Sequence, residues 1–216
     1  MTLEETLKKI KPLDKSAMKN ASKRWDSIAK PLHSLGKMED MVIQIAGIEG
    51  TADVSIGKRA LVAMCADNGV VEEGVTQTGQ EVTAIVARNF LKGDTSACVM
   101  CRQCHTDVFP VDVGMVVDTE VPTDLKVVMG TRNMTKGPAM TKEEAVKGLE
   151  AGIEMVVRLK EKGYNLLATG EMGIGNTTTS SAVASVLLDE PVEKMTGRGA
   201  GLSSEGLHRK IEAIHR

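Results

Sequence analysis

The residues with the clearest chemical potential lie between Asn165 and Thr179, in the sequence NLLATGEMGIGNTTT. This pattern predicts a short buried strand, a glycine turn and then a helix start rich in hydroxyl groups. A helix N-terminus has free backbone N–H groups and a partial positive charge, so it binds anions, above all phosphate. Gly173 and Gly175 let the backbone approach a ligand closely, and Glu171 places a carboxylate on the rim. The stretch therefore predicts chemistry on a phosphorylated small molecule.

A second glycine-rich loop, MTGRGAG, follows at residues 195–201. Arg198 could form a bidentate pair with phosphate, and Lys210 could reach the same pocket from the following helix. The alternative interpretation is a flexible connector with solvated charges. The glycine turn at 173–178 lacks the third glycine of a dinucleotide-binding fingerprint and the Gly-Lys-Ser/Thr of a P-loop. It therefore indicates phosphate binding but matches neither of these nucleotide-binding motifs.

The elements that must position these residues change in character along the chain. Residues 1–46 predict helices, including one over 37–45, and a small helical subdomain. Residues 47–216 predict an α/β nucleotide-binding domain, with apolar strands at 60–66, 108–114, 125–129 and 166–169. Helices are expected at 81–91 and 94–104, from a capping box at Thr141 to Gly163, and at 178–188. Together these features predict a doubly wound, mainly parallel sheet with a small N-terminal helical subdomain.

Glycine together with an acid or an amide follows each predicted strand. The clusters are Asp67-Asn68-Gly69, Asp112 with Gly114, Gly130-Thr131-Arg132-Asn133, and Gly170-Glu171. Ligands bind at the carboxyl ends of the strands in open α/β sheets. Turn residues at strand ends are the simpler explanation for any one cluster. Four clusters at one edge of the sheet favour a binding site.

Composition excludes several classes of function. The net charge is −2 and only four residues are aromatic, which argues against binding of nucleic acid. No apolar run approaches the length of about 20 residues that a membrane span needs. The first eleven residues are charged and do not form a signal peptide. Four cysteines do not make a disulfide framework, so we expect a cytoplasmic protein.

Three of the cysteines form a ladder at Cys98, Cys101 and Cys104, and His105 follows. The spacing contains the attachment pattern of c-type haem and could suggest a metal cluster. Haem attachment requires export, however, and no partner Cys-x-x-Cys lies elsewhere. Cysteines spaced by three share one side of a helix and then behave as small apolar residues. We expect no metal and no cofactor.

Taken together, the chain resembles the nicotinate-nucleotide–dimethylbenzimidazole phosphoribosyltransferase family of cobalamin lower-ligand synthesis. The matching stretches come in family order and cover nearly the whole chain. They are LGKME at 35–39, ADNGV at 66–70, EGV at 73–75, QEVT at 80–83, DVG at 112–114, GTRN at 130–133, GPAM at 137–140, GEMGIGNTT at 170–178, GRG at 197–199, GL at 206–207 and Lys210.

The resemblance implies transfer of phosphoribose from nicotinate mononucleotide to a benzimidazole nitrogen, which gives α-ribazole phosphate and nicotinate. Glu171 would be the catalytic carboxylate that stabilises oxocarbenium charge. The turn at 173–178, Arg198 and Lys210 would hold the 5′-phosphate, and the loop at 75–80 would line the benzimidazole pocket. The expected substrate-binding residues are Asp67, Gln77, Thr78, Gln80, Arg132, Asn133, Gly173, Gly175, Asn176, Thr177, Thr178, Arg198, Gly199 and Lys210.

The chain departs from the family pattern in two places. Thr78-Gly79 stand where the family usually has Tyr-Pro, which concerns the choice of acceptor base. The family also continues beyond the second glycine-rich loop, and the resemblance puts its general base in that later part. A homodimer is the family's expected assembly. The alternatives are a nucleotide-binding module without turnover and, more remotely, a cysteine-based metal or haem protein.

Overall fold

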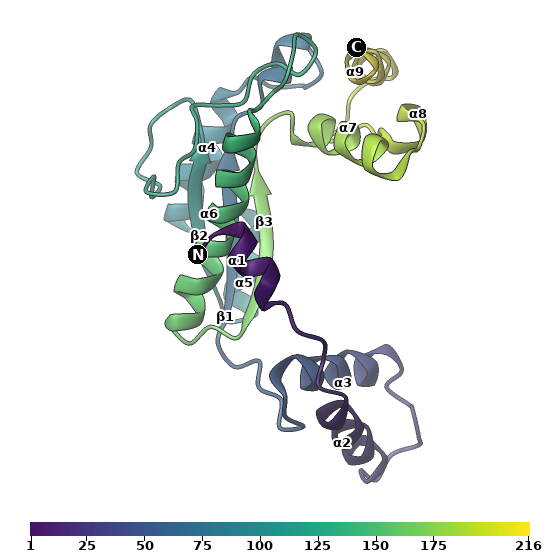
Figure 1. Cartoon of the computed structure of the whole chain (residues 1–216). Helices are drawn as coiled ribbons and strands as arrows, with labels where there is room; N and C mark the ends of the chain where they lie inside the picture. Colours follow the sequence, from purple (N-terminus) through teal and green to yellow (C-terminus); the bar gives the residue numbers. More distant parts are fainter. The chain divides into compact units, whose positions relative to one another are not determined.

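The computed structural model describes all residues from Met1 to Arg216. The chain divides into two compact units (Figure 1), of which one is Thr2–Gly57 and the other is Lys58–Arg216 together with Met1. The first unit contains only helices, whereas the second combines strands and helices. The α/β unit therefore begins immediately before its first strand.

The helical unit contains α1 (Leu3–Lys9), α2 (Lys15–Asp26) and α3 (Lys37–Glu49). Asp14 caps α2, because its Oδ1 accepts hydrogen bonds from the amides of Ser16 at 2.8 Å and Ala17 at 2.9 Å. Gly47 lets α3 approach α2 closely, since a Cβ at this position would lie 2.7 Å from Met18 Cγ. The unit is thus held by a cap and one tight helix–helix contact.

The last helix of this unit is longer than the sequence predicts. The expected helix ends at Ile45, but α3 continues to Glu49. Gly50 then takes a left-handed conformation (φ +71°), and its amide donates to the carbonyl of Ala46. The glycine cap, rather than the end of the apolar pattern, therefore sets the end of the helix.

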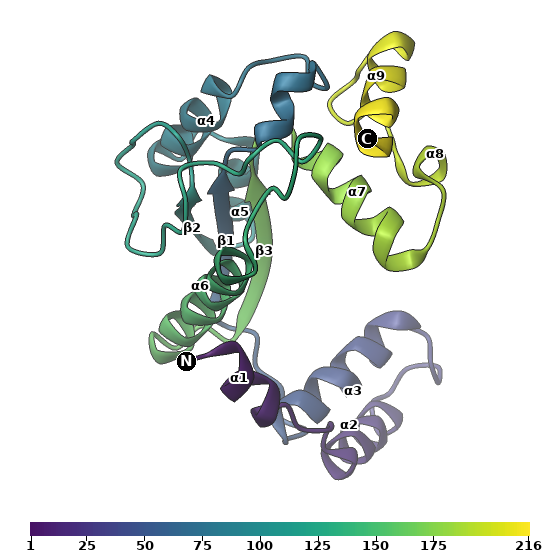
Figure 2. The same ribbon diagram turned by 45° about the horizontal axis from the view of Figure 1, so that its top comes forward.

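The α/β unit is built on β1 (Arg59–Ala66), β2 (Thr106–Gly114) and β3 (Leu166–Met172). The strand order is β2-β1-β3 and both pairings are parallel. Arg59 lies opposite Thr106 on one side and opposite Leu166 on the other, so the three strands begin level (Figure 2). Their carboxyl ends consequently meet at one edge of the sheet, where the sequence predicts the site.

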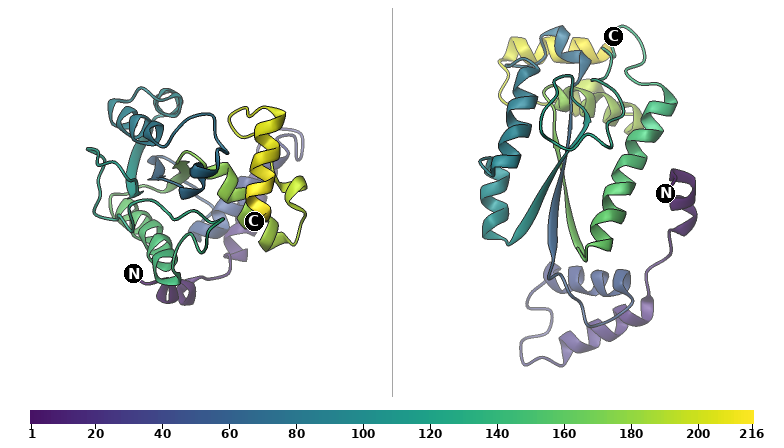
Figure 3. Two further views of the ribbon diagram at one scale, coloured as in Figure 1. Left: turned by 90° about the horizontal axis from the view of Figure 1, so that it is seen from above. Right: turned by 90° about the vertical axis from the view of Figure 1, so that its left-hand side faces the viewer.

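The helices of this unit are η1 (Gly69–Glu73, a 3-10 helix), α4 (Glu81–Lys92), α5 (Ser96–Gln103), α6 (Lys142–Glu161), α7 (Asn176–Leu188), α8 (Val192–Met195) and α9 (Ser204–His215). Both faces of the sheet are covered by helices, whereas α7, α8 and α9 lie beyond the strand ends (Figure 1, Figure 2). Met155 and Leu159 of α6 pack against Val62 of β1. Ala87 of α4 packs against Cys65 on the opposite face. The right-hand view of Figure 3 shows α4 and α6 on opposite sides of the sheet, which confirms the doubly wound α/β fold.

The predicted strand at 125–129 is wrong, because this segment is irregular. It lies beside β2 but makes only isolated backbone hydrogen bonds, such as that from the Val127 amide to the Val113 carbonyl at 3.0 Å. Nearby, the Asp112 amide of β2 donates to the carbonyl of Pro122 at 3.0 Å. Pro122 has no N–H with which to continue strand pairing. Leu125 packs into the core and Lys126 forms an ion pair with Asp112 at 3.1 Å. The apolar residues of this segment are therefore explained by packing against the core, and not by the hydrogen bonds of a β-strand.

The last strand also differs from its prediction as a buried strand. β3 pairs on one side only, with β1, and Leu166, Ala168, Thr169 and Glu171 are exposed. The strand runs on to Met172, so Glu171 lies within it rather than in the turn. None of the helices combines the length and the apolar composition that a membrane crossing requires.

Candidate active site

The glycine turn lies between β3 and α7, as predicted. Gly175 caps α7 with a left-handed backbone (φ +91°) and offers no capping side chain. A Cβ at Gly173 would lie 2.2 Å from the carbonyl oxygen of Ala66, so only glycine fits there. In the first turn of α7 the amides of Asn176 and Thr178 donate to the carbonyls of Gly173 and Gly175, and the Thr177 amide between them is left for an anion.

This turn forms one wall of a pocket of about 170 Å³. Two other segments face it, the loop after η1 and the second glycine-rich loop. The lining residues are Val75, Thr76, Gln77, Thr78, Met172, Gly173, Ile174, Gly175, Asn176, Thr177, Arg198, Gly199, Ala200 and Leu202. The Gln77 side chain donates to the Gly201 carbonyl at 2.6 Å and so ties two of the three walls together.

Two cations stand at this pocket without an acidic partner. Lys210 is 1% exposed, and its Nζ donates to Thr177 Oγ1 at 2.8 Å and to the Gly197 carbonyl at 3.1 Å. Burial lowers the pKa of Lys210. The Arg198 guanidinium donates to the Leu202 carbonyl at 2.7 Å and to Ser204 Oγ at 3.0 Å. A buried ammonium is costly without a counter-charge, so the arrangement fits an anionic ligand.

Glu171 lies next to the turn. Its carboxylate accepts a hydrogen bond from the side-chain amide of Asn176, which lines the pocket. The residue as a whole is exposed, but partial burial of its carboxylate raises the pKa of Glu171, and the hydrogen bond from Asn176 opposes the rise. The glycine turn therefore has Arg198 on the pocket wall, Lys210 behind Thr177, and a carboxylate without a cationic partner behind Asn176.

Comparisons with known proteins identify the family of the chain. A family model described as phosphoribosyltransferase matches residues 10–216. A nicotinate-nucleotide–dimethylbenzimidazole phosphoribosyltransferase of Ruminiclostridium cellulolyticum is 52% identical over 99% of this chain and 61% of its own length. The protein of the same name from Acetivibrio thermocellus is 50% identical over 98% of this chain and 61% of its own length. The chain belongs to this phosphoribosyltransferase family.

A solved structure supports the same assignment. The crystal structure of CobT from Thermus thermophilus superposes with a TM-score of 0.87 and 39% sequence identity. The match covers 93% of this chain and 61% of that one. The chain thus spans about 61% of the length of the relatives that it matches.

Six of the residues expected to bind substrate do not line this pocket. Lys210 is one of them, and it reaches the pocket wall through its hydrogen bond to Thr177. The other five are Asp67, Gln80, Arg132, Asn133 and Thr178. Asp67 is 2% exposed and its Oδ2 accepts from the Val116 amide at 2.8 Å. Arg132 pairs with Glu144 at 2.9 Å, and Asn133 donates to Glu73 at 2.6 Å. The hydroxyl of Thr178 is buried without a partner. Their observed contacts stabilise the loops at the strand ends.

Two residues outside the expected set hold the turn itself. The Asn68 side-chain amide donates to the Ile174 carbonyl at 3.0 Å, and Thr83 Oγ1 accepts from the Ile174 amide at 3.1 Å. Both lie in stretches that resemble the family, ADNGV and QEVT. An asparagine after a strand and a threonine in a helix are ordinary choices, so the sequence gives no signal of this role. Only the contacts of these residues with Ile174 identify it.

The cysteine ladder lies on α5, away from the pocket. Cys98 is buried and its Sγ lies 3.6 Å from the Phe90 carbonyl, whereas Cys101 is half-buried and Cys104 is exposed. No group of three or more His, Cys, Asp or Glu side chains is arranged to hold a metal ion. Cys65, at the end of β1, is fully buried, and burial raises its pKa to about 12. It therefore stays a thiol in the core.

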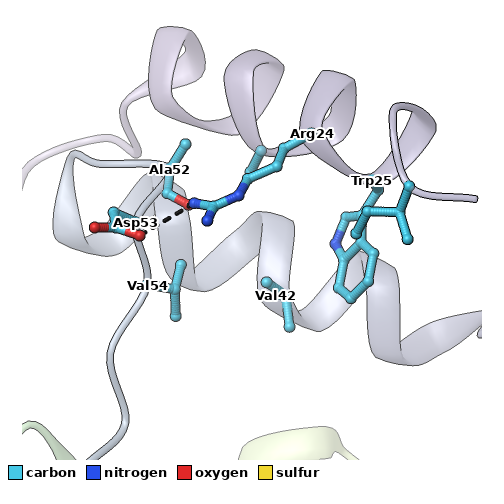
Figure 4. A pocket seen from close by; sticks show the side chains of 8 residues that line it. Arg24, Trp25, Val42, Ala52, Asp53 and Val54 are labelled. Atoms are coloured by element: carbon cyan, nitrogen blue, oxygen red, sulfur yellow. Dashed lines mark hydrogen bonds and ion pairs between the residues drawn. The ribbon is translucent and has the colours of Figure 1, made fainter.

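A second pocket, of about 180 Å³, lies within the helical unit (Figure 4). Trp25 and Val42 line it, together with Arg24 and Asp53. The Arg24 guanidinium donates to Asp53 Oδ1 at 3.1 Å. Because this cation already has its anion, the second pocket lacks the charge arrangement of the first.

Proposed function

We propose that this chain carries the nucleotide site of an enzyme that transfers phosphoribose from nicotinate mononucleotide to 5,6-dimethylbenzimidazole or a related azole. The products are α-ribazole 5′-phosphate and nicotinate, in cobalamin biosynthesis. The names of the relatives and the resemblance in ordered motifs support this substrate pair. The observation that carries the proposal is the pair of cations without an acidic partner, Arg198 and Lys210, beside a glycine turn at a helix start.

The 5′-phosphate would lie against the first turn of α7, where Thr177 and the Lys210 ammonium meet. The ribose would then point towards Glu171. As the bond between C1′ and the nicotinate nitrogen breaks, its electron pair returns to the pyridine ring and positive charge develops on the ribose. A carboxylate stabilises such charge most strongly when water is excluded. Glu171, held by its bond to Asn176 beside the turn, is the carboxylate placed for this role.

The acceptor would lie beneath the loop that contains Gln77 and Thr78. Its nitrogen lone pair attacks C1′, and its N–H proton must leave to a base. The family resemblance places that base in the part of the relatives that this chain does not match. Thr78-Gly79, in place of Tyr-Pro, would leave more room above a flat base.

A second candidate is a binding module that holds nicotinate mononucleotide without turnover. The coverage of only 61% of the relatives' length favours it for this chain alone. Isothermal titration with nicotinate mononucleotide, followed by an assay of nicotinate release with dimethylbenzimidazole present, separates the two. Binding with release supports the enzyme, whereas binding without release supports the module. Absence of nucleotide binding would contradict both.

We also propose a cytoplasmic homodimer, in which residues 1–46 contribute to a small helical subdomain and residues 47–216 form the nucleotide-binding part. The dimer rests on the family resemblance. Light scattering coupled to gel filtration tests the dimer, and a monomeric mass at micromolar concentration would contradict it.

A further inference from the structure

We propose that Asn68 is a positioning residue of the anion site, which fixes the carbonyl of Ile174 and so sets the glycine turn for phosphate. This inference rests on the proposed function of the pocket. Asn68 directly follows β1 and is 9% exposed. Its Nδ2 donates to the Ile174 carbonyl at 3.0 Å across 106 residues of sequence. It is therefore one of the few side chains that join the end of β1 to the turn after β3.

The turn is held from both sides. Thr83 is fully buried on α4, and its Oγ1 accepts from the Ile174 amide at 3.1 Å. Both polar backbone groups of Ile174 are thus used within the protein. The amides of Asn176 and Thr178 close the turn onto the carbonyls of Gly173 and Gly175. The backbone of Gly175 and Thr177, which lines the pocket, then remains to face a ligand.

The orientation of the Asn68 amide follows from its partners. Thr179 Oγ1 donates to Asn68 Oδ1 at 3.3 Å, and the Ile174 carbonyl needs a donor. The backbone carbonyl of Asn68 accepts a hydrogen bond from Gln80 Nε2 at 2.9 Å, which fixes the main chain of the residue. A Cβ at Gly175 would lie 3.3 Å from the Asn68 Cβ, so residue and turn are in direct contact. An aspartate here would direct an acceptor at another acceptor.

Asn68 acts through the turn and not on the ligand. It does not line the pocket, and both polar atoms of its side chain have partners in the protein. Loss of Asn68 should consequently weaken binding by moving the donors of the turn, while the cations Arg198 and Lys210 stay in place.

The test compares Asn68→Asp with wild type by titration calorimetry, with nicotinate mononucleotide and with inorganic phosphate as probes. At about pH 8 the ionised aspartate repels the Ile174 carbonyl, and we expect binding about 10-fold weaker or more. At about pH 5 a buried aspartate takes up a proton and can donate again, so the ratio of the two dissociation constants should return towards one. The ratio removes the ligand's own titration from the comparison.

The matched control is Thr179→Val, which removes the bond to Oδ1 but leaves the donor to Ile174 intact. We expect it to change affinity by about 2-fold or less at either pH. Equal binding by Asn68→Asp and wild type at high pH would overturn the inference. So would a loss that persists unchanged at low pH.

If the wild-type chain binds neither probe, the proposed function fails, and the role of Asn68 is judged from the turn itself. Hydrogen exchange of the Ile174 and Asn176 amides, which are hydrogen-bonded within the turn, should then be faster in Asn68→Asp than in wild type at high pH and similar at low pH. Unchanged exchange at high pH would show that Asn68 does not fix the turn.

Discussion

Two lysines that are largely shielded from solvent have different surroundings. In the helical unit, Lys30 Nζ donates to Glu39 Oε1 at 2.7 Å, and the two side chains are 13% and 4% exposed. In the α/β unit, Lys210 has only a hydroxyl and a carbonyl as partners. The first lysine has its counter-charge in the protein, whereas the second lacks one. A pocket of similar volume occurs in each unit, so the unbalanced charge, and not the volume, marks the candidate site.

The comparison extends to Glu171, whose partner is an amide and not a cation. The largest effect is expected from Glu171→Gln, made at the aligned residue of a relative that spans the whole family length. Removing the charge while keeping the shape should lower kcat by about 100-fold or more, with little change in nucleotide binding. Steady-state nicotinate release measures this. Near-normal turnover together with lower stability would instead make Glu171 a structural residue.

Lys210→Met separates binding from stability. A charge-assisted hydrogen bond to phosphate is worth about 1.5–3 kcal/mol, so the affinity of this chain for nicotinate mononucleotide should fall by about 10- to 150-fold. The unfolding free energy without ligand should not fall, because the variant removes a buried charge that has no counter-ion. Calorimetry and urea unfolding measure the two quantities. A large loss of stability would show that the ammonium serves the fold.

The two arginines provide a matched pair of variants. Arg198→Ala should weaken phosphate binding by about 5- to 10-fold, since this residue is exposed and solvent screens its charge. Arg24→Ala removes a cation that Asp53 already neutralises and should leave phosphate affinity unchanged. Equal losses in both variants would mean that net charge, and not the pocket, governs binding.

The sequence predicts the role of Lys210 and the glycine turn, but not the contacts that hold the turn in place. Lys210 is expected from its place after a glycine-rich loop, and its helix places it against Thr177. The glycine turn and the capping box of Thr141 with Glu144 are local patterns, and both form as predicted. The bonds of Asn68 and Thr83 to Ile174 join residues 106 and 91 positions apart, and no local pattern encodes such distances.

The strand wrongly predicted at 125–129 also reflects pairing that a local pattern does not encode. Apolar periodicity shows that a segment is buried but does not show what its backbone pairs with. Leu125 is half-buried and packs against the core, as a strand residue would, yet the hydrogen bonds of the segment are isolated. Likewise, an apolar sequence predicts a buried β3, whereas the strand has a neighbour on one side only.

Lys30→Met tests the paired side of the comparison. It leaves the Glu39 carboxylate buried with only the Leu35 amide and a distant His33 as polar neighbours. The helical unit should unfold at a temperature about 4–8 °C lower, while phosphate affinity stays unchanged. Trp25, the chain's one tryptophan, lies 5.5 Å from Lys30 Nζ and reports this unit by fluorescence. A change in phosphate affinity would contradict the assignment of Lys30 to structure alone.

The smallest effects are expected from pH, and their signs differ at the two lysines. The hydrogen bond from Lys30 lowers the pKa of Glu39 from 4.5, so the folded state binds this proton less tightly than the unfolded state. The stability that the pair contributes is present above pH 4.5 and is lost as the pH falls through the folded pKa. Trp25 fluorescence in urea titrations should record this loss in wild type and not in Glu39→Gln.

Burial lowers the pKa of Lys210 from 10.5, so the folded α/β unit releases this proton before the unfolded chain does. Its unfolding free energy should therefore gain a contribution as the pH rises through the window just below 10.5. Phosphate affinity should fall over the same window, because the ammonium loses its charge. Other groups titrate at alkaline pH, so the quantity to measure is the difference between wild type and Lys210→Met by circular dichroism. A difference that does not vary with pH would mean that Lys210 keeps its ordinary pKa and that its counter-charge is already in the protein.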